Sequence, residues 1–425
     1  MKRVESITHK VDWVTVLIYA VIVLWGWVNI FSVTYDENAN QSIFDLSLNS
    51  GKQMMFIVVS ALIIGVILII DMRFYETFAY IIYGVLLFVL LLVPFIGKEV
   101  GGNTAWIGIG SFGVQPSEFA KFATALAIAK FAGSIGFRMD NFRNQVILFA
   151  FICAPIILIL AQKDAGTALV FTVFVLVFYR EGLSPFLLLV GLGITIIFVL
   201  TLLVENEYIL FGLIAVAWGV VIFFQRRKKL KRLAIITVGA LMLMGTIKSV
   251  DFLFNNVLQD HQQKRIRVLL NPELDQLGVG YHVYQSKVAI GSGGFIGKGF
   301  LKGTQTKLKF VPEQNTDFIF CTIGEEHGWV GSLFVISLFI ALILRVIFLA
   351  ERQKNRFARV YGYSVACILF FHFTINIGMT IGLFPVIGIP LPFFSYGGSS
   401  LLAFTILLFI LLKLDAHRMH VLQRI

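Results

Sequence analysis

The polar sequence HQQKRIRVLLNPELDQLGVGYHVYQSKVAIGSGGFIGKGFLKGTQTKLKFVPEQNTD occupies residues 261–317, within the one long hydrophilic interval of the chain, Asn256 to Asp317. The sequence on both sides of it is strongly apolar. Hydrophobic residues make up 58% of the 425 residues, charged residues only 14%, and the mean hydropathy is +0.87. Soluble domains carry roughly 25% charged residues, so composition alone indicates an integral membrane protein.

Apolar runs of the length that crosses a bilayer, roughly 17–25 helical residues, follow one another along the chain. They predict an all-α, polytopic helical bundle of about twelve transmembrane helices. We expect residues 1–425 to form a single membrane domain, with 256–317 as its long extracellular loop. The runs fall at about 12–33, 53–71, 75–97, 117–133, 145–161, 165–180, 184–204, 207–224, 233–254, 318–350, 357–383 and 397–414.

Lysine and arginine gather in alternate connections between these runs, most densely in QRRKKLKR at residues 225–232. Basic residues mark cytoplasmic loops, which places both termini inside and the 256–317 interval outside. This pattern also explains the net charge of +11 without a nucleic-acid partner. The three cysteines, Cys153, Cys321 and Cys367, lie far apart in apolar runs, so their spacing indicates neither a disulfide framework nor a zinc site.

Two motifs place ionisable groups at the ends of predicted helices. In GGNTAWIGIGSFGVQPSEFAKF, residues 101–122, Pro116 suits a first helical turn, and Glu118 and Lys121 share one helical face. Charged groups at membrane depth usually face each other or a cavity, so this is either a structural ion pair or the lining of a substrate groove. Asp164, in QKDAGTAL, is either a helix N-cap or a support for an active site.

Two further motifs interrupt the apolar pattern. In the long interval, Arg265 and Arg267 precede NPELD, and arginine binds phosphate oxygens bidentately. GSGGFIGKG, residues 291–299, resembles a phosphate-cradling loop only loosely. Near the C-terminus, three prolines break the apolar run between Asn376 and Ser400, which predicts either a plain connection or irregular backbone buried in protein. Together these features indicate a membrane enzyme or transporter for an anionic, lipid-linked substrate at the outer leaflet.

At this point the motifs resemble a known family. QPSE (Gln115 to Glu118), the long outer interval and PLPFFSYGGSS (390–400) are similar to the SEDS family of RodA, FtsW and SpoVE, over about residues 103–415. GSGGFIGKGFLKGTQ and GLFPVIGIPLPFFSYGG are most like RodA. The resemblance implies a core of ten helices, so the runs 207–224 and 233–254 are expected to be an extra pair.

The activity implied by the resemblance is that of a peptidoglycan glycosyltransferase in the bacterial cytoplasmic membrane. Such an enzyme polymerises lipid II at the outer face of the membrane during cell elongation. The implied partners are a class B penicillin-binding protein and the membrane and cytoskeletal proteins of the elongation complex. No cofactor is firmly implied, and a divalent cation, Mg²⁺ or Mn²⁺, at the pyrophosphate is left open. A lipid II flippase is the alternative function.

The same resemblance implies roles for individual residues. Asp275 in NPELDQLG would be the catalytic general base of an inverting transfer. The substrate-binding residues implied are Arg265, Lys121, Glu118, Asp164, Gln115 and Ser117. The chain departs from the family pattern at Gln276 and Lys163, which replace prolines, and at Asn315, which replaces a histidine.

Overall fold

The computed structural model describes residues 11–35, 42–100, 103–109, 112–204, 207–225, 230–252, 254, 256, 263, 265, 279–308 and 310–418. The chain divides into two compact units. Unit 1 contains residues 1–182 and 282–425, and unit 2 contains residues 183–281. We describe each unit by itself.

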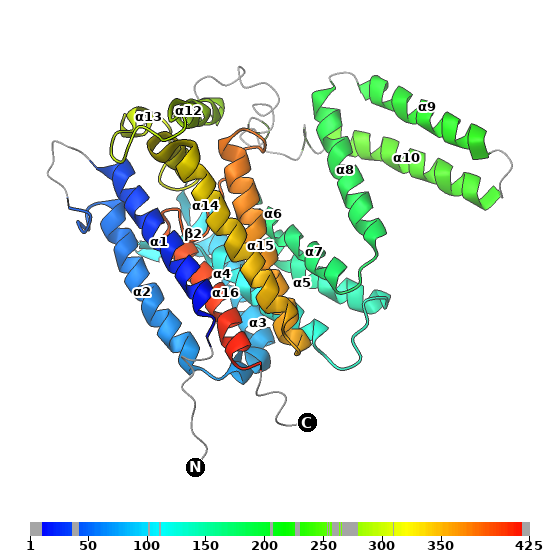
Figure 1. Cartoon of the computed structure of the whole chain (residues 1–425). Coiled ribbons are helices and arrows are strands. Elements are labelled where there is room, and N and C mark those ends of the chain that lie inside the picture. Colours follow the sequence, from blue (N-terminus) through cyan, green and yellow to red (C-terminus); the bar gives the residue numbers. More distant parts are fainter. Residues whose placement is uncertain are drawn as a thin grey trace, which may run out of the picture. The chain divides into compact units, whose positions relative to one another are not determined.

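The described residues are mainly helical (Figure 1), as predicted. In unit 1 the helices are α1 (Trp13–Thr34), α2 (Asn49–Ile69), α3 (Met72–Ile96), α4 (Pro116–Ala132), α5 (Phe142–Ala161), α6 (Ala165–Val170), the 3₁₀ turn η3 (Phe171–Val173), α7 (Phe174–Arg180), α13 (Thr304–Lys307), α14 (Ile319–Glu351), α15 (Arg356–Thr380) and α16 (Gly398–Ala416). Unit 2 contains α8 (Pro185–Leu203), α9 (Glu207–Gln225) and α10 (Leu230–Phe252), and α12 (Val279–Ser292) begins at its end.

The twelve apolar runs expected from the sequence are all helical in the described residues. Seven of these helices, α1, α2, α3, α5, α14, α15 and α16, are long and apolar enough to cross a membrane. The protein is therefore a multi-pass membrane protein, and the number of crossings stays a prediction. The run at 165–180 is divided into α6, η3 and α7.

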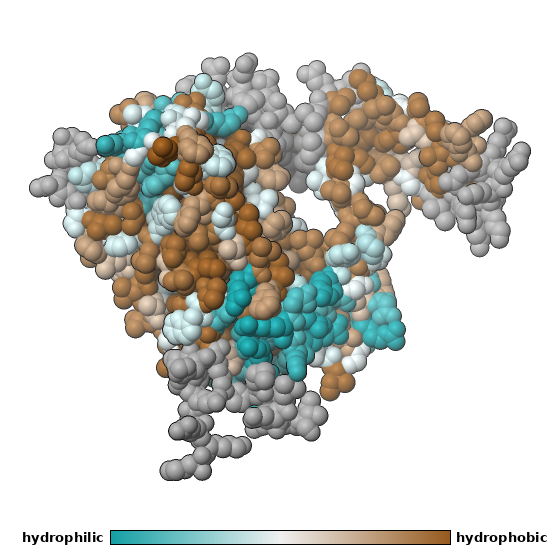
Figure 2. Space-filling model, in the orientation of Figure 1, coloured by the Kyte–Doolittle hydropathy of each residue, from teal (hydrophilic) through white to brown (hydrophobic). Residues whose placement is uncertain are grey.

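Helices α4 and α16 form the interior of unit 1. The most apolar stretch of α16 is 83% buried, whereas that of α2 is 17% buried. α4 packs against α3, α15 and α16, and its small residues, such as Ala123 and Ala127, meet Tyr83 of α3. Small residues at such contacts let helices approach closely, which is how helices pack without a hydrophobic driving force in lipid. The apolar side chains of the outer helices cover much of the visible surface (Figure 2), as lipid contact requires.

A three-stranded antiparallel sheet, which the sequence had not predicted, connects α3 to α4. Its strands are β1 (Lys98–Val100), β2 (Asn103–Ile109) and β3 (Phe112–Val114) in the order β1-β2-β3. Ile107 pairs with Val114, and Lys98 pairs with Trp106 across a register shift. The Thr104 N–H donates to the Gln162 carbonyl (3.1 Å), which fastens the sheet to the turn before α6.

The glycine-rich sequence 291–299 packs against an interruption in α14. Gly328 has φ 62° and ψ −155°, so the helix breaks there. The Trp329 N–H donates to the Gly294 carbonyl (2.9 Å), and the Gly299 N–H donates to the Glu326 carbonyl (2.9 Å). A Cβ atom on Gly293 would lie 1.9 Å from the Gly324 carbonyl oxygen. These glycines therefore permit a close backbone contact, which differs from the loose resemblance to a phosphate-binding loop.

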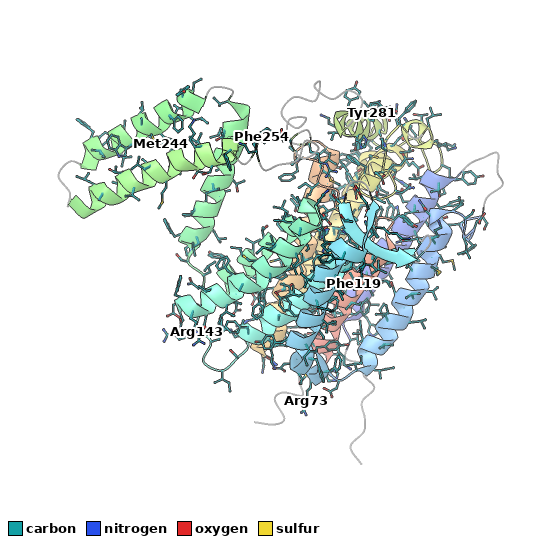
Figure 3. All side chains as sticks on the ribbon, turned by 180° about the vertical axis from the view of Figure 1, so that it is seen from behind. Arg73, Phe119, Arg143, Met244, Phe254 and Tyr281 are labelled. Carbon is teal, nitrogen blue, oxygen red and sulfur yellow. The ribbon has the colours of Figure 1, made fainter. Side chains whose placement is uncertain are left out.

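Ion pairs fasten helix ends at the side of unit 1 opposite α12. Arg345 of α14 donates to both carboxylate oxygens of Asp12 (2.5 and 3.1 Å), which also caps α1 through Thr15. Burial by itself would raise the pKa of the Asp12 carboxyl, but the hydrogen bonds from Arg345 and Thr15 lower it to about 2. Arg352 pairs in the same region with Asp415 of α16. Arg73 and Arg143 also lie toward this end (Figure 3), as the charge pattern requires if it is the cytoplasmic side.

Unit 2 consists of an apolar helical hairpin packed on a third helix. α10 contacts both α8 and α9, and the Trp218 indole N–H donates to the Thr237 hydroxyl (3.2 Å) between the two arms of the hairpin. The pair expected at 207–224 and 233–254 is therefore present as α9 and α10.

Replacing Gly26 by valine tests the contact between α1 and the segment before α16. A Cβ atom at Gly26 would lie 2.6 Å from the backbone oxygen of Phe394, whereas one at Gly65 of α2 meets nothing within 4 Å. Overpacking costs about 1–3 kcal/mol, so Gly26→Val should lower the thermal unfolding midpoint of the purified protein. Gly65→Val is the matched control and should leave the midpoint nearly unchanged. Equal shifts for the two variants would contradict this packing.

Candidate functional site

A buried ion pair at the start of α4 forms the centre of the site. Glu118 and Lys121 lie three residues apart, and Lys121 Nζ is 2.8 Å from Glu118 Oε1. Their side chains are only 3% and 2% exposed. Glu118 is in the first turn of α4, where the helix dipole favours a carboxylate. The structure therefore contains the ion pair between Glu118 and Lys121. The pair lies inside the bundle, where burying an unpaired charge would destabilise the fold.

His372 of α15 is a third member of this buried group. The sequence alone did not identify it. Its Nε2 lies 3.1 Å from Lys121 Nζ, and its Nδ1 lies 3.1 Å from the Pro390 carbonyl oxygen. A carbonyl only accepts, so Nδ1 carries the proton and Nε2 accepts from the ammonium group. The Phe404 ring lies 4.6 Å from Lys121 Nζ and packs edge-on against His372. The ammonium group therefore has a carboxylate, an imidazole and an aromatic face as neighbours.

Gln115 and Asp164 lie together beside the start of α6. Gln115 Nε2 donates to Asp164 Oδ2 (2.8 Å), while Asp164 Oδ1 accepts from the Thr167 N–H (3.0 Å). Asp164 is thus an N-cap, as one reading of the sequence predicted, and it also bonds to the QPSE motif. Lys163 has φ 65°, a conformation closed to proline, so a proline at this position would require a change in the local backbone. Ser117 is fully buried.

The proline-containing segment between α15 and α16 is irregular and buried, as the second reading of the sequence predicted. Ile389, Leu391 and Phe394 are each 1% exposed. Asn376 Nδ2 donates to the carbonyls of Ile389 and Asp317 (both 2.9 Å). Non-helical backbone at membrane depth requires such internal partners. The segment is therefore held in one conformation by polar side chains of the surrounding helices.

Ser395 and Gln53 provide further partners for this segment. The Ser395 hydroxyl donates to the Thr316 carbonyl (2.6 Å) and accepts from the Leu391 N–H (2.9 Å). Gln53 of α2 accepts from the Gly397 N–H (3.3 Å). The segment before α16 is thereby joined to the residues before α14 and to α2.

The predicted catalytic residue Asp275 lies outside the described residues. Arg265 is described, and its Nε atom is buried without a hydrogen-bond partner among the described residues. It belongs to unit 2, whereas Glu118, Lys121, Asp164, Gln115 and Ser117 belong to unit 1. The structure therefore brings together four of the predicted substrate-binding residues, through the pairs Glu118–Lys121 and Gln115–Asp164.

Glu325, another buried carboxylate, has a structural role. Its Oε1 accepts from the N–H groups of Thr304 and Gln305 (2.7 and 2.8 Å) and from Lys298 Nζ (2.7 Å), and its Oε2 accepts from the Thr306 N–H (2.9 Å). It therefore anchors α13 and the glycine-rich segment to α14. The signal for both His372 and Glu325 was an ionisable residue within an apolar run, which usually marks a partner or a functional site.

Most of the chain matches the family of cell cycle proteins represented by FtsW, RodA and SpoVE, over residues 12–210 and 179–420. It is 32% identical to the peptidoglycan glycosyltransferase MrdB of Escherichia coli K12 over 402 residues, which cover 95% of this chain and 91% of MrdB. It is 30% identical to the peptidoglycan glycosyltransferase RodA of Treponema pallidum, covering 91% and 94% of the two chains. Among solved structures, one on the coordination of polymerisation and crosslinking by a peptidoglycan synthase complex is similar, with 25% identity and a TM-score of 0.70, covering 96% of this chain and 98% of that one.

The ion pair predicts a specific pattern of stability in variants of α4. Lys121→Met leaves the Glu118 carboxylate buried without its ammonium partner, which should destabilise the protein by about 3–5 kcal/mol. Adding Glu118→Gln removes that charge as well and should recover part of the loss in thermal unfolding measurements. Lys130→Met, on the same helix but only half-buried, is the matched control. Strictly additive shifts for the two substitutions would show that the side chains are not coupled.

Proposed function

The chain belongs to the FtsW, RodA and SpoVE family, and from this premise we propose that it is a peptidoglycan glycosyltransferase that polymerises lipid II during cell elongation. The observation that carries the proposal is its alignment with a peptidoglycan glycosyltransferase over 95% of its length at 32% identity. The fold agrees, because a multi-pass helical bundle can hold a lipid-linked substrate. The reaction takes place at the outer face of the cytoplasmic membrane, and both termini are cytoplasmic.

The proposed reaction is an inverting glycosyl transfer. The 4-hydroxyl of the acceptor GlcNAc attacks the anomeric carbon of the MurNAc on the growing chain. The bond from that carbon to the pyrophosphate breaks, and undecaprenyl pyrophosphate leaves. A hydroxyl is a weak nucleophile at neutral pH, and a positioned carboxylate that takes its proton contributes roughly 10²–10⁴-fold. We assign this role to Asp275.

Fixed cations stabilise the negative charge that develops on the leaving pyrophosphate. Arg265 is the first choice because guanidinium groups bind phosphate oxygens in pairs. Lys121 is the second, and its surroundings indicate how it contributes. Its Nζ already contacts Glu118 and His372 and is almost fully buried, so its main contribution is to position the proline-containing segment. Glu118 orients Lys121, and Gln115, Ser117 and Asp164 support the same part of the groove.

A divalent cation, Mg²⁺ or Mn²⁺, would act at the pyrophosphate. Within the described residues, no group of three His, Cys, Asp or Glu side chains is placed to hold a metal ion. The phosphate oxygens of the substrate would supply ligands to this ion, and we assign no step to it.

The proposed partner is a class B penicillin-binding protein that crosslinks the glycan product. It is supported by the similarity to a synthase structure that coordinates polymerisation with crosslinking. Membrane and cytoskeletal proteins of the elongation complex would join the same assembly. A lipid II flippase is less well supported, because the relatives reported above are glycosyltransferases.

Asp275→Asn tests the catalytic assignment. The amide cannot take the proton, so glycan synthesis from purified lipid II should fall by about 10²-fold or more. Asp260→Asn, a carboxylate in the same hydrophilic interval, is the matched control and should retain synthesis. Lipid II translocation should be measured in parallel. Normal polymer from Asp275→Asn would overturn the assignment, and translocation lost together with polymer would favour the flippase.

Arg265→Ala tests the stabilisation of the leaving group. Removing one fixed donor from a developing charge typically costs about 10²-fold in turnover, and the thermal unfolding midpoint should stay near that of the parent. The control is Arg138→Ala, because Arg138 is exposed and pairs with Asp140 at the surface. A lost unfolding transition in Arg265→Ala would identify a structural residue instead.

A further inference from the structure

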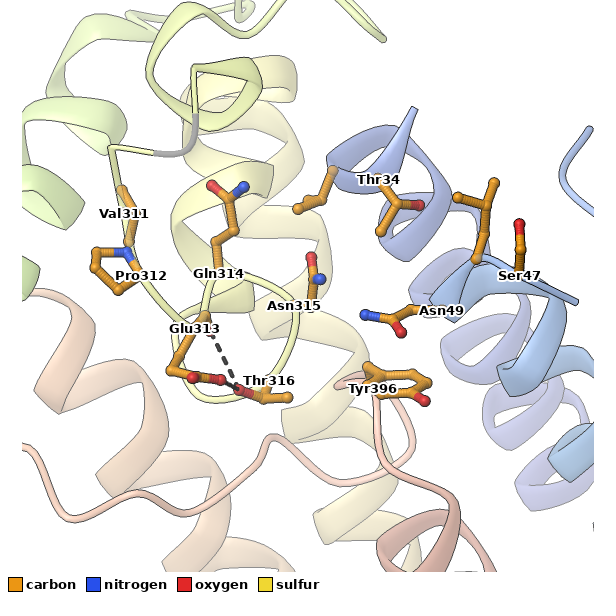
Figure 4. A pocket seen from close by; sticks show the side chains of 12 residues that line it. Thr34, Ser47, Asn49, Val311, Pro312, Glu313, Gln314, Asn315, Thr316 and Tyr396 are labelled. Atoms are coloured by element: carbon orange, nitrogen blue, oxygen red, sulfur yellow. Dashed lines mark hydrogen bonds between the residues drawn. The ribbon is translucent and has the colours of Figure 1, made fainter. Parts of the chain in front are cut away.

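A cavity of about 570 Å³ lies beside the segment that precedes α16 (Figure 4). It is formed by the end of α1, the start of α2 and the residues that precede α14, all of which belong to unit 1. Its volume falls within the range of roughly 300–1,000 Å³ that is usual for small-molecule sites. Its lining includes Tyr396 of the PLPFFSYGGSS motif and residues 311–316 of the hydrophilic interval, and none of these residues has been given a role in the proposed reaction.

The lining of the cavity selects a class of ligand. Its polar side chains are hydroxyls and amides with one carboxylate, and they include Ser47, Asn49, Glu313, Asn315 and Thr316. Among the described residues that line it, none is lysine, arginine or histidine, so the cavity does not suit a pyrophosphate. The number of polar groups also makes it unsuitable for a lipid tail. Neutral groups that both donate and accept hydrogen bonds suit a ligand rich in hydroxyl and amide groups.

Tyr396 supplies an aromatic surface to the same space. Figure 4 shows the amide groups of Asn49 and Asn315 and the Tyr396 ring converging on the cavity. Asn315 Oδ1 has no hydrogen-bond partner among the described residues. A ligand hydroxyl or amide N–H would supply a donor to this oxygen. An aromatic face beside convergent polar groups can pack against the apolar face of a sugar ring.

Hydrogen bonds join the two segments that form one wall of the cavity. The Tyr396 N–H donates to the Asn315 carbonyl (2.9 Å), and the Ser395 hydroxyl donates to the Thr316 carbonyl (2.6 Å). Glu313 has φ 54°, and its carboxylate accepts from the Thr316 hydroxyl (3.1 Å). These contacts fix the backbone that carries the Tyr396 ring and the Asn315 amide before a ligand arrives, which reduces the entropic cost of binding.

One short segment of the chain connects the cavity to the buried ion pair. Tyr396 lies six positions after Pro390, whose carbonyl accepts from His372, and six steps of extended chain span at most about 22 Å. A polymerase must hold one sugar of its substrate while a neighbouring sugar reacts, so the proposed reaction requires a saccharide subsite.

We propose that this cavity is a saccharide subsite that holds an N-acetylated sugar of the glycan. The Tyr396 ring forms its platform, and Asn49, Asn315 and Glu313 bond to the hydroxyl and acetamido groups. The inference rests on the proposed function, because it takes the sugar from the substrate of that reaction.

The test measures binding of soluble GlcNAc–MurNAc disaccharide and tetrasaccharide to the full chain in detergent, by saturation-transfer NMR and calorimetry. Tyr396→Ala should weaken binding by about tenfold, whereas Tyr396→Phe, which keeps the ring, should remain within about threefold of the parent. Asn49→Ala should also weaken binding. This second variant allows the prediction to be tested even if Tyr396→Ala does not fold. The matched control is Tyr179→Ala, because Tyr179 is a half-exposed tyrosine of α7.

Unchanged saccharide binding in folded Tyr396→Ala and Asn49→Ala, or binding by the parent of a free stem pentapeptide in place of the saccharide, would overturn the proposal. Asp275→Asn separates it from the proposed catalysis. This variant should bind the saccharide like the parent while its glycan synthesis falls by about 10²-fold or more. If Asp275→Asn made polymer normally, only the catalytic assignment would be contradicted. The saccharide-binding measurements would still show whether the cavity is a saccharide subsite.

Discussion

The contact between the Lys121 ammonium group and its neighbours organises the interior of unit 1. A charge in this environment is tolerated only when it is paired, and Lys121 meets Glu118 from its own helix, His372 from α15 and the Phe404 ring from α16. Three helices are therefore brought into register by one cation. Because His372 also donates to the Pro390 carbonyl, the same contact reaches the irregular segment between α15 and α16.

The irregular segment between α15 and α16 connects this ion pair to the polar residues near the cavity. Asn376 holds the Ile389 and Asp317 carbonyls, and Ser395 joins Thr316 to Leu391. Backbone that would be unsatisfied in lipid is thus converted into a fixed scaffold by buried side chains. One end of the scaffold lies against the ion pair and the other carries Tyr396 at the edge of the cavity. We expect a substitution at either end to alter the backbone conformation of the whole segment.

The sequence predicted the helices well because hydropathy and length are local properties that the bilayer enforces. It also predicted the Glu118–Lys121 pair, since residues three apart share a helical face. It could not predict His372 as the third member, because that contact joins residues 251 positions apart. The three-stranded sheet was missed for a similar reason, as its short strands contain glycines and resemble a loop. The glycines of 291–299 were ambiguous, because permissive backbone serves anion binding and close packing equally well.

The hydrophilic interval that first set this chain apart is only partly a loop. Its second half contains α12 and α13, and the Ser286 hydroxyl donates to the Thr380 carbonyl (2.9 Å) at the end of α15. Glu325 and the backbone of the broken helix α14 hold the glycine-rich part in place. Glycosyl transfer requires its reacting groups to be held near one another, which is worth far more than the binding of either group alone. Under the proposed function, the hydrogen-bonded second half of the interval would supply that positioning. Its buried polar partners hold a segment that the sequence alone presents as a connection.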